Sequence, residues 1–136
     1  LLLNAKRPAI YAGGCVVMSN ASEQLREFAE RTSCVLGTRA VKYSNCADKS
    51  VRRVAVAGGA TTDFIAPAAA LGADVIVGGE FKHHAWGYAE AQGIALIEAG
   101  HYHTENPVCR RLAEIVRSAD ADITVDVLDY SPFSII

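Results

Sequence analysis

Short apolar runs that end at a pair of glycines recur along this chain, and each is followed by a segment with helical character. The valine-rich run at residues 51–57 and the run at residues 74–77 both follow this pattern. Neither run alternates strictly between apolar and polar residues, which is typical of strands buried on both faces of a parallel sheet. Strands that alternate with helices predict an α/β fold. We therefore expect a three-layer, Rossmann-like architecture with a mostly parallel sheet and helices on both of its faces.

Local patterns assign the remaining elements. Helical spacing follows a capping-box-like start at residues 20–23 and continues to Thr32, and residues 82–91 form a second expected helix. A longer helix is expected to be capped by Thr104 and to carry Pro107 in its first turn. Further expected elements are strands at residues 8–12, 34–36, 94–98 and 123–128, and an alanine-rich helix from Thr61 or Thr62 to about Gly72.

Length and composition indicate one folded domain over residues 1–136, since the chain is 51% hydrophobic and only 21% charged. The formal net charge of −2 and the scattered basic residues disfavour nucleic acid as a partner. No apolar run is long enough to span a bilayer, so we expect no membrane partner and a cytoplasmic location. The four cysteines are widely spaced, which predicts reduced thiols in or near the core.

The last five residues, 132–136, are mostly apolar and include a phenylalanine and two isoleucines. Leaving these side chains in water forfeits several kcal/mol of hydrophobic stabilisation, so the tail should pack against something. We expect it to support a homo-oligomer, either a dimer or a larger assembly.

The four histidines fall within residues 83–103, and both pairs lie near glycine turns that follow predicted strands. Because ligands of open α/β sheets sit at the carboxyl ends of the strands, these side chains are expected to converge. His101 in a turn and Glu105 in the first helical turn could face one cation, and imidazole with carboxylate suits zinc, iron, manganese or nickel. The alternative is that His101 is a polar turn residue and Glu105 only favours the start of the helix.

Four further residues are possible members of the site: His103, His83, His84 and Glu80. For His83 and His84 the alternative is simple solvation on a helix surface. The glycine pairs could present N–H groups to a phosphate, but none completes a nucleotide-binding motif, so we interpret them as tight turns. No catalytic residue and no cofactor-binding residue is assigned.

The sequence Ala-Lys-Arg-Pro-Ala-Ile-Tyr-Ala-Gly-Gly at residues 5–14, followed by Ser-Glu-Gln-Leu-Arg at residues 22–26, resembles a known family. It is similar to the start of the middle domain of acetolactate-synthase-type thiamine diphosphate enzymes, over residues 4–37. The resemblance implies a βα unit of a doubly wound domain. The thiamine site of that family lies in other domains, so neither thiamine diphosphate nor FAD is expected here.

Residues 39–136 resemble a different family, through four motifs. These are Val-Arg-Arg-Val-Ala-Val-Ala-Gly-Gly-Ala at 51–60, Leu-Gly-Ala-Asp-Val-Ile at 71–76, Gly-Glu-Phe-Lys-His-His-Ala at 79–85 and Gly-His-Tyr-His-Thr-Glu at 100–105. They are similar to the C-terminal half of the NGG-interacting-factor-like dinuclear-metal proteins, also known as GTP cyclohydrolase type-two homologues. The resemblance implies that His101 and Glu105 are metal ligands. It places the family's other ligands, a His-His pair and an Asp, in its N-terminal half.

Two resemblances in one chain predict a recombined protein, with residues 1–38 from one source, residues 39–136 from another, and a seam near residues 36–39. We expect a folded domain without a complete active site and with residual metal binding, rather than an enzyme. Two alternatives stay open. One is a metal-dependent hydrolase that acts on a nucleotide or a similar small molecule, and the other is an oligomeric scaffold.

Overall fold

The computed structural model describes residues 20–46, 49–120 and 122–131, with side chains described from Gln24 onward. The expected strand at 8–12 and the apolar tail at 132–136 lie outside the described residues. The strands are β1 (Asn20–Gln24), β2 (Lys42–Tyr43), β3 (Ser50–Val56), β4 (Val75–Gly78) and β5 (Ala95–Glu98). The helices are α1 (Leu25–Leu36), α2 (Ile65–Ala70), α3 (His83–Ala91), α4 (His101–Glu105) and α5 (Pro107–Ala119), with a 3-10 turn, η2 (Thr62–Phe64), before α2.

Within the described residues the strands form one sheet in the order β1-β3-β4-β5-β2. The three central strands are parallel, with Val54 opposite Val75 and Val75 opposite Ala95. The two edge strands, β1 and β2, pair antiparallel with β3 and β5. The α/β prediction is therefore confirmed, but the sheet is mixed, and a mostly parallel, Rossmann-like sheet is not what these pairings show.

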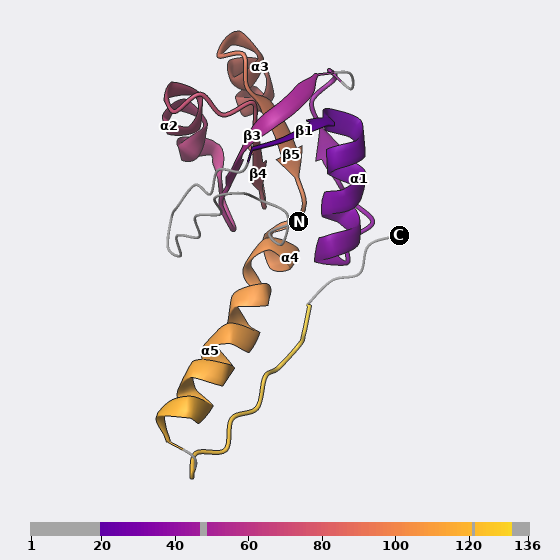
Figure 1. The fold of residues 1–136 in the computed structure, drawn as a ribbon. Coiled ribbons are helices and arrows are strands. Elements are labelled where there is room, and N and C mark those ends of the chain that lie inside the picture. Colours follow the sequence, from indigo (N-terminus) through magenta and orange to yellow (C-terminus); the bar gives the residue numbers. More distant parts are fainter. Residues whose placement is uncertain (1–19, 47–48, 121, 132–136) are drawn as a thin grey trace.

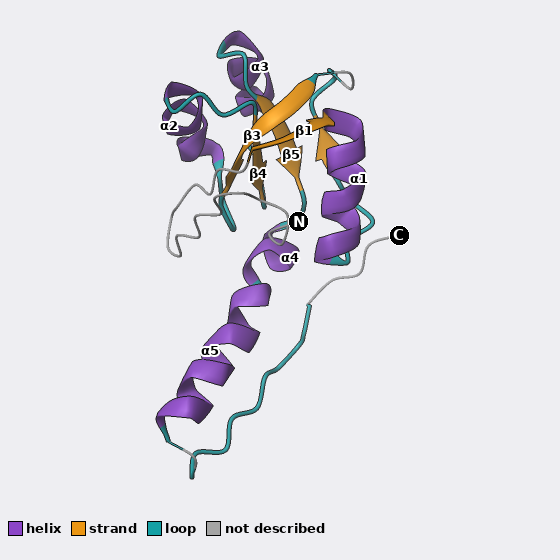
Figure 2. Ribbon diagram, in the orientation of Figure 1, coloured by secondary structure: helices purple, strands orange, loops and turns teal. Residues whose placement is uncertain are grey.

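Helices cover both faces of the sheet (Figures 1 and 2). Side chains at alternate positions of the central strands enter two separate apolar clusters. The cluster on the α1 side contains Leu25, Phe28, Val54, Val75 and Ile97. The cluster on the α2 and α3 side contains Ile65, Ala85, Ala55, Ile76 and Leu96. Because both faces of β4 and β5 and the Val54–Ala55 part of β3 are buried, these segments are apolar without period-two alternation, as the sequence indicated.

The central elements agree with the expectations. The predicted strands at 51–57, 74–77 and 94–98 correspond to β3, β4 and β5, and the helices expected after Thr61 and at 82–91 correspond to η2 with α2 and to α3. The expected strand at 34–36 is wrong, because these residues form the last turn of α1. The amphipathic pattern of that helix runs on to Gly37, whose φ of 65° ends it with a left-handed cap.

Four further expectations are corrected. Residues 20–23 are not a helix cap but part of β1, which pairs with β3. Thr104 does not cap the long helix, because a separate short helix, α4, already begins at His101. Residues 123–128 belong to no strand of the sheet. Within the described residues, the cysteines Cys34, Cys46 and Cys109 are free but exposed rather than buried in the core.

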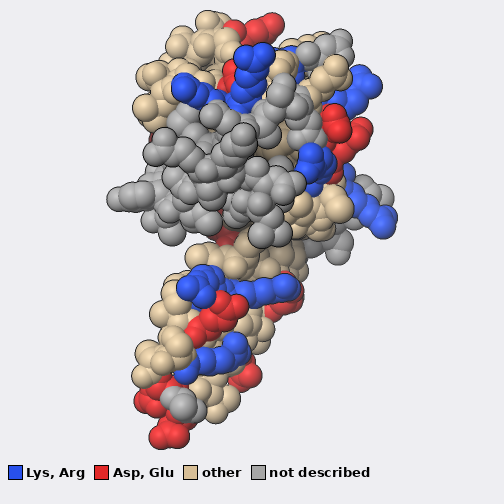
Figure 3. All heavy atoms as spheres, in the orientation of Figure 1, with Lys and Arg blue, Asp and Glu red and all other residues tan. Residues whose placement is uncertain are grey.

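Helix α5 projects away from the sheet, and the segment before the C-terminus returns beside it (Figure 1). The Arg117 guanidinium donates to the carbonyl of Val125 at 2.6 Å, which ties the returning segment to the helix. Ala113 is the one buried side chain of α5. Basic and acidic side chains are intermixed over this projection (Figure 3). Across the described residues, no helix is both long and apolar enough to cross a membrane.

Candidate functional site

Three loops meet where the parallel strands β3, β4 and β5 end. Backbone hydrogen bonds join them directly: Glu80 N–H donates to the carbonyl of Gly59 at 3.0 Å, and Thr61 N–H donates to the carbonyl of Glu80 at 3.0 Å. The third loop is joined in the same way, since Gly100 N–H donates to the carbonyl of Gly79 at 3.1 Å. This edge of the sheet is where open α/β folds hold their ligands.

Two threonine hydroxyls add side-chain bonds between the same loops. The fully buried Thr61 donates from Oγ1 to the carbonyl of Gly59 at 2.9 Å and accepts from Gly79 N–H at 3.2 Å. Thr104 of α4 accepts from Gly59 N–H at 3.2 Å. Its hydroxyl also lies 3.0 Å from the carbonyl of Gly100, to which it donates. Thr104 therefore fastens α4 to the loop after β3.

Gly59 and Gly79 lie at the centre of this contact, where a larger side chain would collide with neighbouring atoms. A Cβ on Gly79 would lie 2.6 Å from the carbonyl oxygen of Gly59 and 2.9 Å from the Cα of His101. A Cβ on Gly59 would lie 2.3 Å from Oε1 of Glu105, and the φ of Gly59 is +68°. The glycine pairs that we interpreted as tight turns thus also permit the loop after β3 to approach α4 closely.

His101 lies between two carboxylates. Its Nε2 is 3.1 Å from Oε2 of Glu105, one turn further along α4, and its Nδ1 is 3.4 Å from Oε1 of Glu80, in the loop after β4. The three side chains are about half exposed, at 42%, 56% and 61% for His101, Glu105 and Glu80. The structure therefore brings these three predicted site residues together.

The three groups do not surround a single point. Because the two ring nitrogens of His101 point in different directions, a cation on Nε2 beside Glu105 would be remote from the carboxylate at Nδ1. Consistent with this, the described residues contain no group of three or more His, Cys, Asp or Glu side chains arranged to hold one metal ion. The arrangement places the carboxylate of Glu105 beside Nε2 of His101, with the carboxylate of Glu80 on the other side of the ring.

The other predicted histidines lie elsewhere. His83 and His84 are exposed in the first turn of α3. His103 packs edge-on against the ring of Tyr102, with 5.5 Å between the ring centres. Its Nδ1 lies 3.1 Å from the position that a Cβ on Gly100 would occupy. His103 therefore faces a different part of the molecule from the carboxylate-flanked ring of His101.

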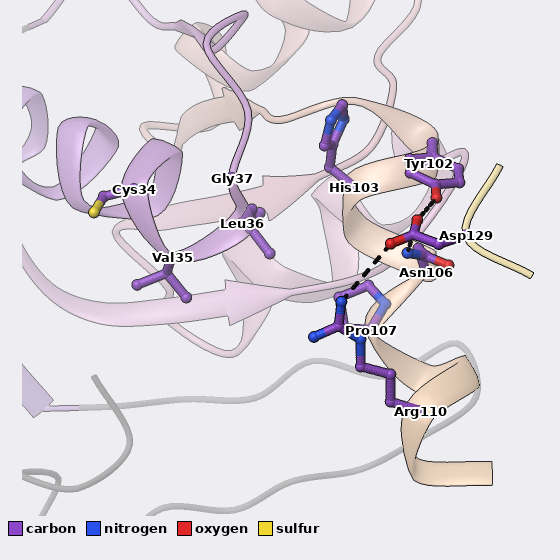
Figure 4. Close-up of a pocket in the computed structure, with 10 residues that line it drawn as sticks. All are labelled: Cys34, Val35, Leu36, Gly37, Tyr102, His103, Asn106, Pro107, Arg110 and Asp129. Carbon is purple, nitrogen blue, oxygen red and sulfur yellow. Dashed lines mark hydrogen bonds and ion pairs between the residues drawn. The ribbon is translucent and has the colours of Figure 1, made fainter. Parts of the chain in front are cut away.

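A cleft of about 490 Å³ lies between the end of α1 and the helices α4 and α5 (Figure 4). Its lining includes Val35, His103 and a polar cluster centred on Asp129. The Tyr102 hydroxyl donates to Oδ1 of Asp129, and Asn106 Nδ2 donates to the same oxygen at 3.2 Å. Arg110 lies 3.8 Å from the other oxygen. The hydrogen bond to Asp129 raises the pKa of Tyr102 above its ordinary value.

Sequence reasoning did not find this cluster. Tyr102, Asn106 and Arg110 follow one another at spacings of four residues, which places them along one side of consecutive helices. This spacing could have indicated that the three residues lie together. No sequence pattern indicated that Asp129 joins them, because it comes from the returning segment 27 residues beyond Tyr102. The polar groups bond to one another, so the cluster ties that segment to α4 and α5.

Comparison with known proteins identifies a family match that spans the described residues and relatives that match parts of the chain. The family model for Duf34/NIF3 (NGG1p interacting factor 3) matches residues 5–132. A GTP cyclohydrolase 1 type 2 homolog from Nostoc sp. is 43% identical over 68 residues, which are 50% of this chain and 26% of the relative. A protein of the same description from Staphylococcus epidermidis is 35% identical over 92 residues, which are 68% of this chain and 25% of the relative. The matched part of the chain thus spans about a quarter of the length of these curated relatives.

Solved structures show the same relationship. The Staphylococcus aureus hypothetical protein SA1388 superposes with a TM-score of 0.77 at 26% identity, over 89% of this chain and 43% of that protein. Reduced HcgD from Methanocaldococcus jannaschii gives a TM-score of 0.72 at 26% identity, over 95% of this chain and 52% of that protein.

The match to one family model continues across the predicted seam at residues 36–39. The resemblance of residues 39–136 is therefore supported. For residues 4–37, the comparisons give no support to a thiamine diphosphate enzyme segment or to a chimera. The short motif at residues 5–14 misled the prediction because an apolar run that ends in two glycines is common to many βα units.

Proposed function

Because this chain belongs to the Duf34/NIF3 (NGG1p interacting factor 3) family, we propose that it contributes His101 and Glu105 to a divalent transition-metal site. The proposed activity is metal-dependent hydrolysis of a nucleotide or a similar small molecule. The observation that carries the proposal is the His101–Glu105 pair, held 3.1 Å apart on one side of α4 beside a glycine with no side chain.

The residues present fit a metal ion in three respects. An imidazole and a carboxylate suit zinc, iron, manganese or nickel. The space beside Nε2 of His101 and Oε1 of Glu105 is one that a Cβ on Gly59 would fill. The spacing of four residues along one helix holds both ligands in register, and Thr104 fastens that helix to the loop of Gly59.

The predicted site residues differ in the tasks that we propose for them. His101 and Glu105 bind the ion, which would supply Lewis acidity for hydrolysis. His103, two residues further along, lines the cleft and faces a different part of the molecule, so we assign it no part in proton transfer at this ion. The substrate class follows the descriptions of the curated relatives, which are homologues of a GTP cyclohydrolase. His83 and His84 are exposed on α3, which favours simple solvation, so we assign them no task at the ion.

Two protein ligands are fewer than the three that catalytic metal sites usually contain. We propose that the remaining ligands come from outside the described residues or from a second chain. We therefore propose a complete enzyme only for an assembly that supplies these further ligands. The matched part of this chain covers about a quarter of the length of the curated relatives. If no further ligand joins the pair, the chain is a domain with residual metal binding and no complete active site, as the sequence first indicated.

The experiment that tests this proposal is zinc titration of the chelator-treated chain, monitored with a competing chromophoric chelator. His101→Ala and Glu105→Ala should each lower zinc affinity at least tenfold, whereas His84→Ala is the matched control for an exposed histidine and should not. Zinc binding by the parent chain no tighter than that of His101→Ala would refute the metal site.

A second candidate function, an oligomeric scaffold, is favoured by the exposed apolar side of α5. Val108, Leu112 and Ile115 are 46%, 53% and 48% exposed on a projecting helix. A helix of 13 residues has marginal stability on its own in water, so a partner surface would stabilise it. We propose that a second copy covers this side, in a soluble homo-oligomer.

The scaffold is tested by sedimentation of the parent chain and of a Leu112→Ser, Ile115→Ser variant. The matched control is Val35→Ser, an exposed valine at the end of α1. The α5 variant should dissociate to monomer while the control keeps the assembly of the parent. A monomeric parent chain would refute the scaffold.

A further inference from the structure

We propose that Glu80 is a positioning residue, whose carboxylate accepts a hydrogen bond from Nδ1–H of His101 and so directs Nε2 to the metal. This inference rests on the proposed metal site and adds a residue that acts on the ligand rather than on the ion. It also assigns the two carboxylates around His101 different tasks, Glu105 as ligand and Glu80 as hydrogen-bond acceptor.

The assignment follows from what the two nitrogens of one imidazole can do. A nitrogen that binds a metal carries no proton, so the neutral ring must then carry its proton on the other nitrogen. That N–H needs an acceptor, and carboxylates or carbonyls supply it at most histidine ligands of metals. Nε2 of His101 faces Glu105 and Nδ1 faces Glu80, which matches this division.

Two observations favour Nε2 of His101 over Nδ1 as the nitrogen that binds the metal: the free room beside it and the helix that it shares with Glu105. The missing side chain of Gly59 leaves room beside Nε2, 3.1 Å from the position of a Cβ, and beside Oε1 of Glu105. Glu105 lies on the same helix as His101, so the two ligands move together. Glu80 comes from another loop and reaches the opposite nitrogen.

The backbone of Glu80 is held at both of its polar groups. Its N–H donates to the carbonyl of Gly59, and its carbonyl accepts from Thr61 N–H, both at 3.0 Å. The side chain therefore starts from a fixed point next to the loop that approaches α4. Its oxygen is 3.4 Å from Nδ1, which is longer than a usual N–H···O bond. Metal binding at Nε2 makes Nδ1–H a stronger donor, so we expect this distance to shorten when the ion is bound.

The expected effect on zinc affinity follows from outer hydrogen-bond partners in other metal sites, whose loss weakens binding by about 10–100-fold. Glu80→Ala should show a loss in this range. Glu80→Gln should restore most of the affinity, because the amide oxygen of glutamine still accepts a hydrogen bond from Nδ1–H. A direct carboxylate ligand would behave differently, since its replacement by an amide would weaken binding as much as alanine does.

The experiment combines zinc titration with nitrogen NMR of the histidine rings in the zinc-loaded, 15N-labelled chain. The spectra should show zinc on Nε2 of His101 and a proton on Nδ1. The exchange of that proton with water should be slow in the parent and in Glu80→Gln and fast in Glu80→Ala. Glu90→Ala and Glu90→Gln, at an exposed position of α3, are the matched controls and should leave zinc affinity unchanged.

Each outcome decides the inference. Zinc on Nδ1, a Glu80→Ala variant that binds zinc as tightly as the parent, or a Glu80→Gln variant as weak as Glu80→Ala would overturn it. In these cases the His101 and Glu105 variants still bind zinc weakly, and the proposed metal site stands. A parent chain that binds no zinc would overturn both. The urea midpoints of the metal-free Glu80 variants should match that of the parent, because the side chain is 61% exposed.

Discussion

Replacing Gly59 with alanine should separate the stability of the fold from its capacity to bind metal. The φ of Gly59 is +68°, a left-handed conformation that costs a residue with a Cβ about 1–2 kcal/mol. The new Cβ would also lie 2.3 Å from Oε1 of Glu105 and 3.1 Å from Nε2 of His101. The Glu105 carboxylate is the far end of a half-exposed side chain, so it can swing into water at little cost to folding. It then leaves His101.

Gly37→Ala is the matched control. Gly37 caps α1 with a φ of +65°, and no atom lies within 4 Å of the position of its Cβ. It therefore carries the same backbone strain without a collision. We expect both variants to lose about 1–2 kcal/mol of unfolding free energy, since both force alanine into the left-handed region. Only Gly59→Ala should lose zinc affinity, by more than about tenfold, because it displaces Glu105, the proposed ligand, rather than an outer partner.

The assay has two parts. Urea unfolding of the metal-free proteins, followed by far-UV circular dichroism, measures the loss of stability, and zinc titration against a competing chelator measures affinity. Equal zinc affinity in Gly59→Ala and Gly37→Ala would refute the claim that the space beside Gly59 belongs to the metal. A loss of stability in Gly59→Ala several kcal/mol beyond that of Gly37→Ala would refute the claim that Glu105 moves away freely.

Three further outcomes are expected. Gly79→Ala should destabilise the chain by about 3 kcal/mol in urea, because its Cβ would meet backbone atoms 2.6 Å and 2.9 Å away that cannot rotate aside; a loss below that of Gly59→Ala would contradict this. Leu96→Ala should cost about 2–5 kcal/mol, since Leu96 is fully buried under α2 and α3, and a loss typical of surface sites would show that this cluster is loosely packed. Asp129 raises the pKa of Tyr102, so the associated stabilisation is fully present below the ordinary pKa of 10.0 and is lost as the pH rises through the folded value. Absorbance titration of tyrosinate should show a late step that Tyr102→Phe removes and Asp129→Ala moves to lower pH; an unchanged step in Asp129→Ala would exclude the hydrogen bond to Asp129 as its cause.

The centre of the sheet could be predicted because burial on both faces leaves a plain pattern in the sequence. Val75, Ile76 and Val77 face alternate clusters, yet all are apolar, so the run is recognisable without knowledge of its neighbours. The glycine turns after β3 and β4 marked where each strand ends. Local sequence thus contained what was needed for β3, β4, β5 and the helices that connect them.

The edges of the sheet could not be predicted, because they depend on distant partners. Lys42 and Tyr43 are exposed and form a strand only by pairing with Glu98 and Ile97, more than 50 residues away. The apolar residues at 34–36 were misassigned as a strand for a related reason. Their short run has strand-like composition, but the helix that precedes them continues through it.

The candidate site was predicted in part. His101, Glu105 and Glu80 lie together as the motifs indicated, and their role as ligands or positioning residue stays a prediction. The bond between Thr104 and Gly59 could not be foreseen, because a hydroxyl near a helix start has the sequence signature of a cap, and its partner is 45 residues away. Asp129 was missed because only the fold brings it to Tyr102.

The contact among Gly59, Gly79 and Thr104 has a consequence for protein engineering. The helix that carries His101 and Glu105 cannot be transferred on its own. Its position depends on the hydrogen bond between Thr104 and the Gly59 loop and on the absence of a side chain at Gly79. A designer who moved residues 100–105 onto a different sheet would transfer the His101 and Glu105 side chains without the surface that orients them. The smallest unit that can be transplanted is the set of three strand ends, together with both glycines.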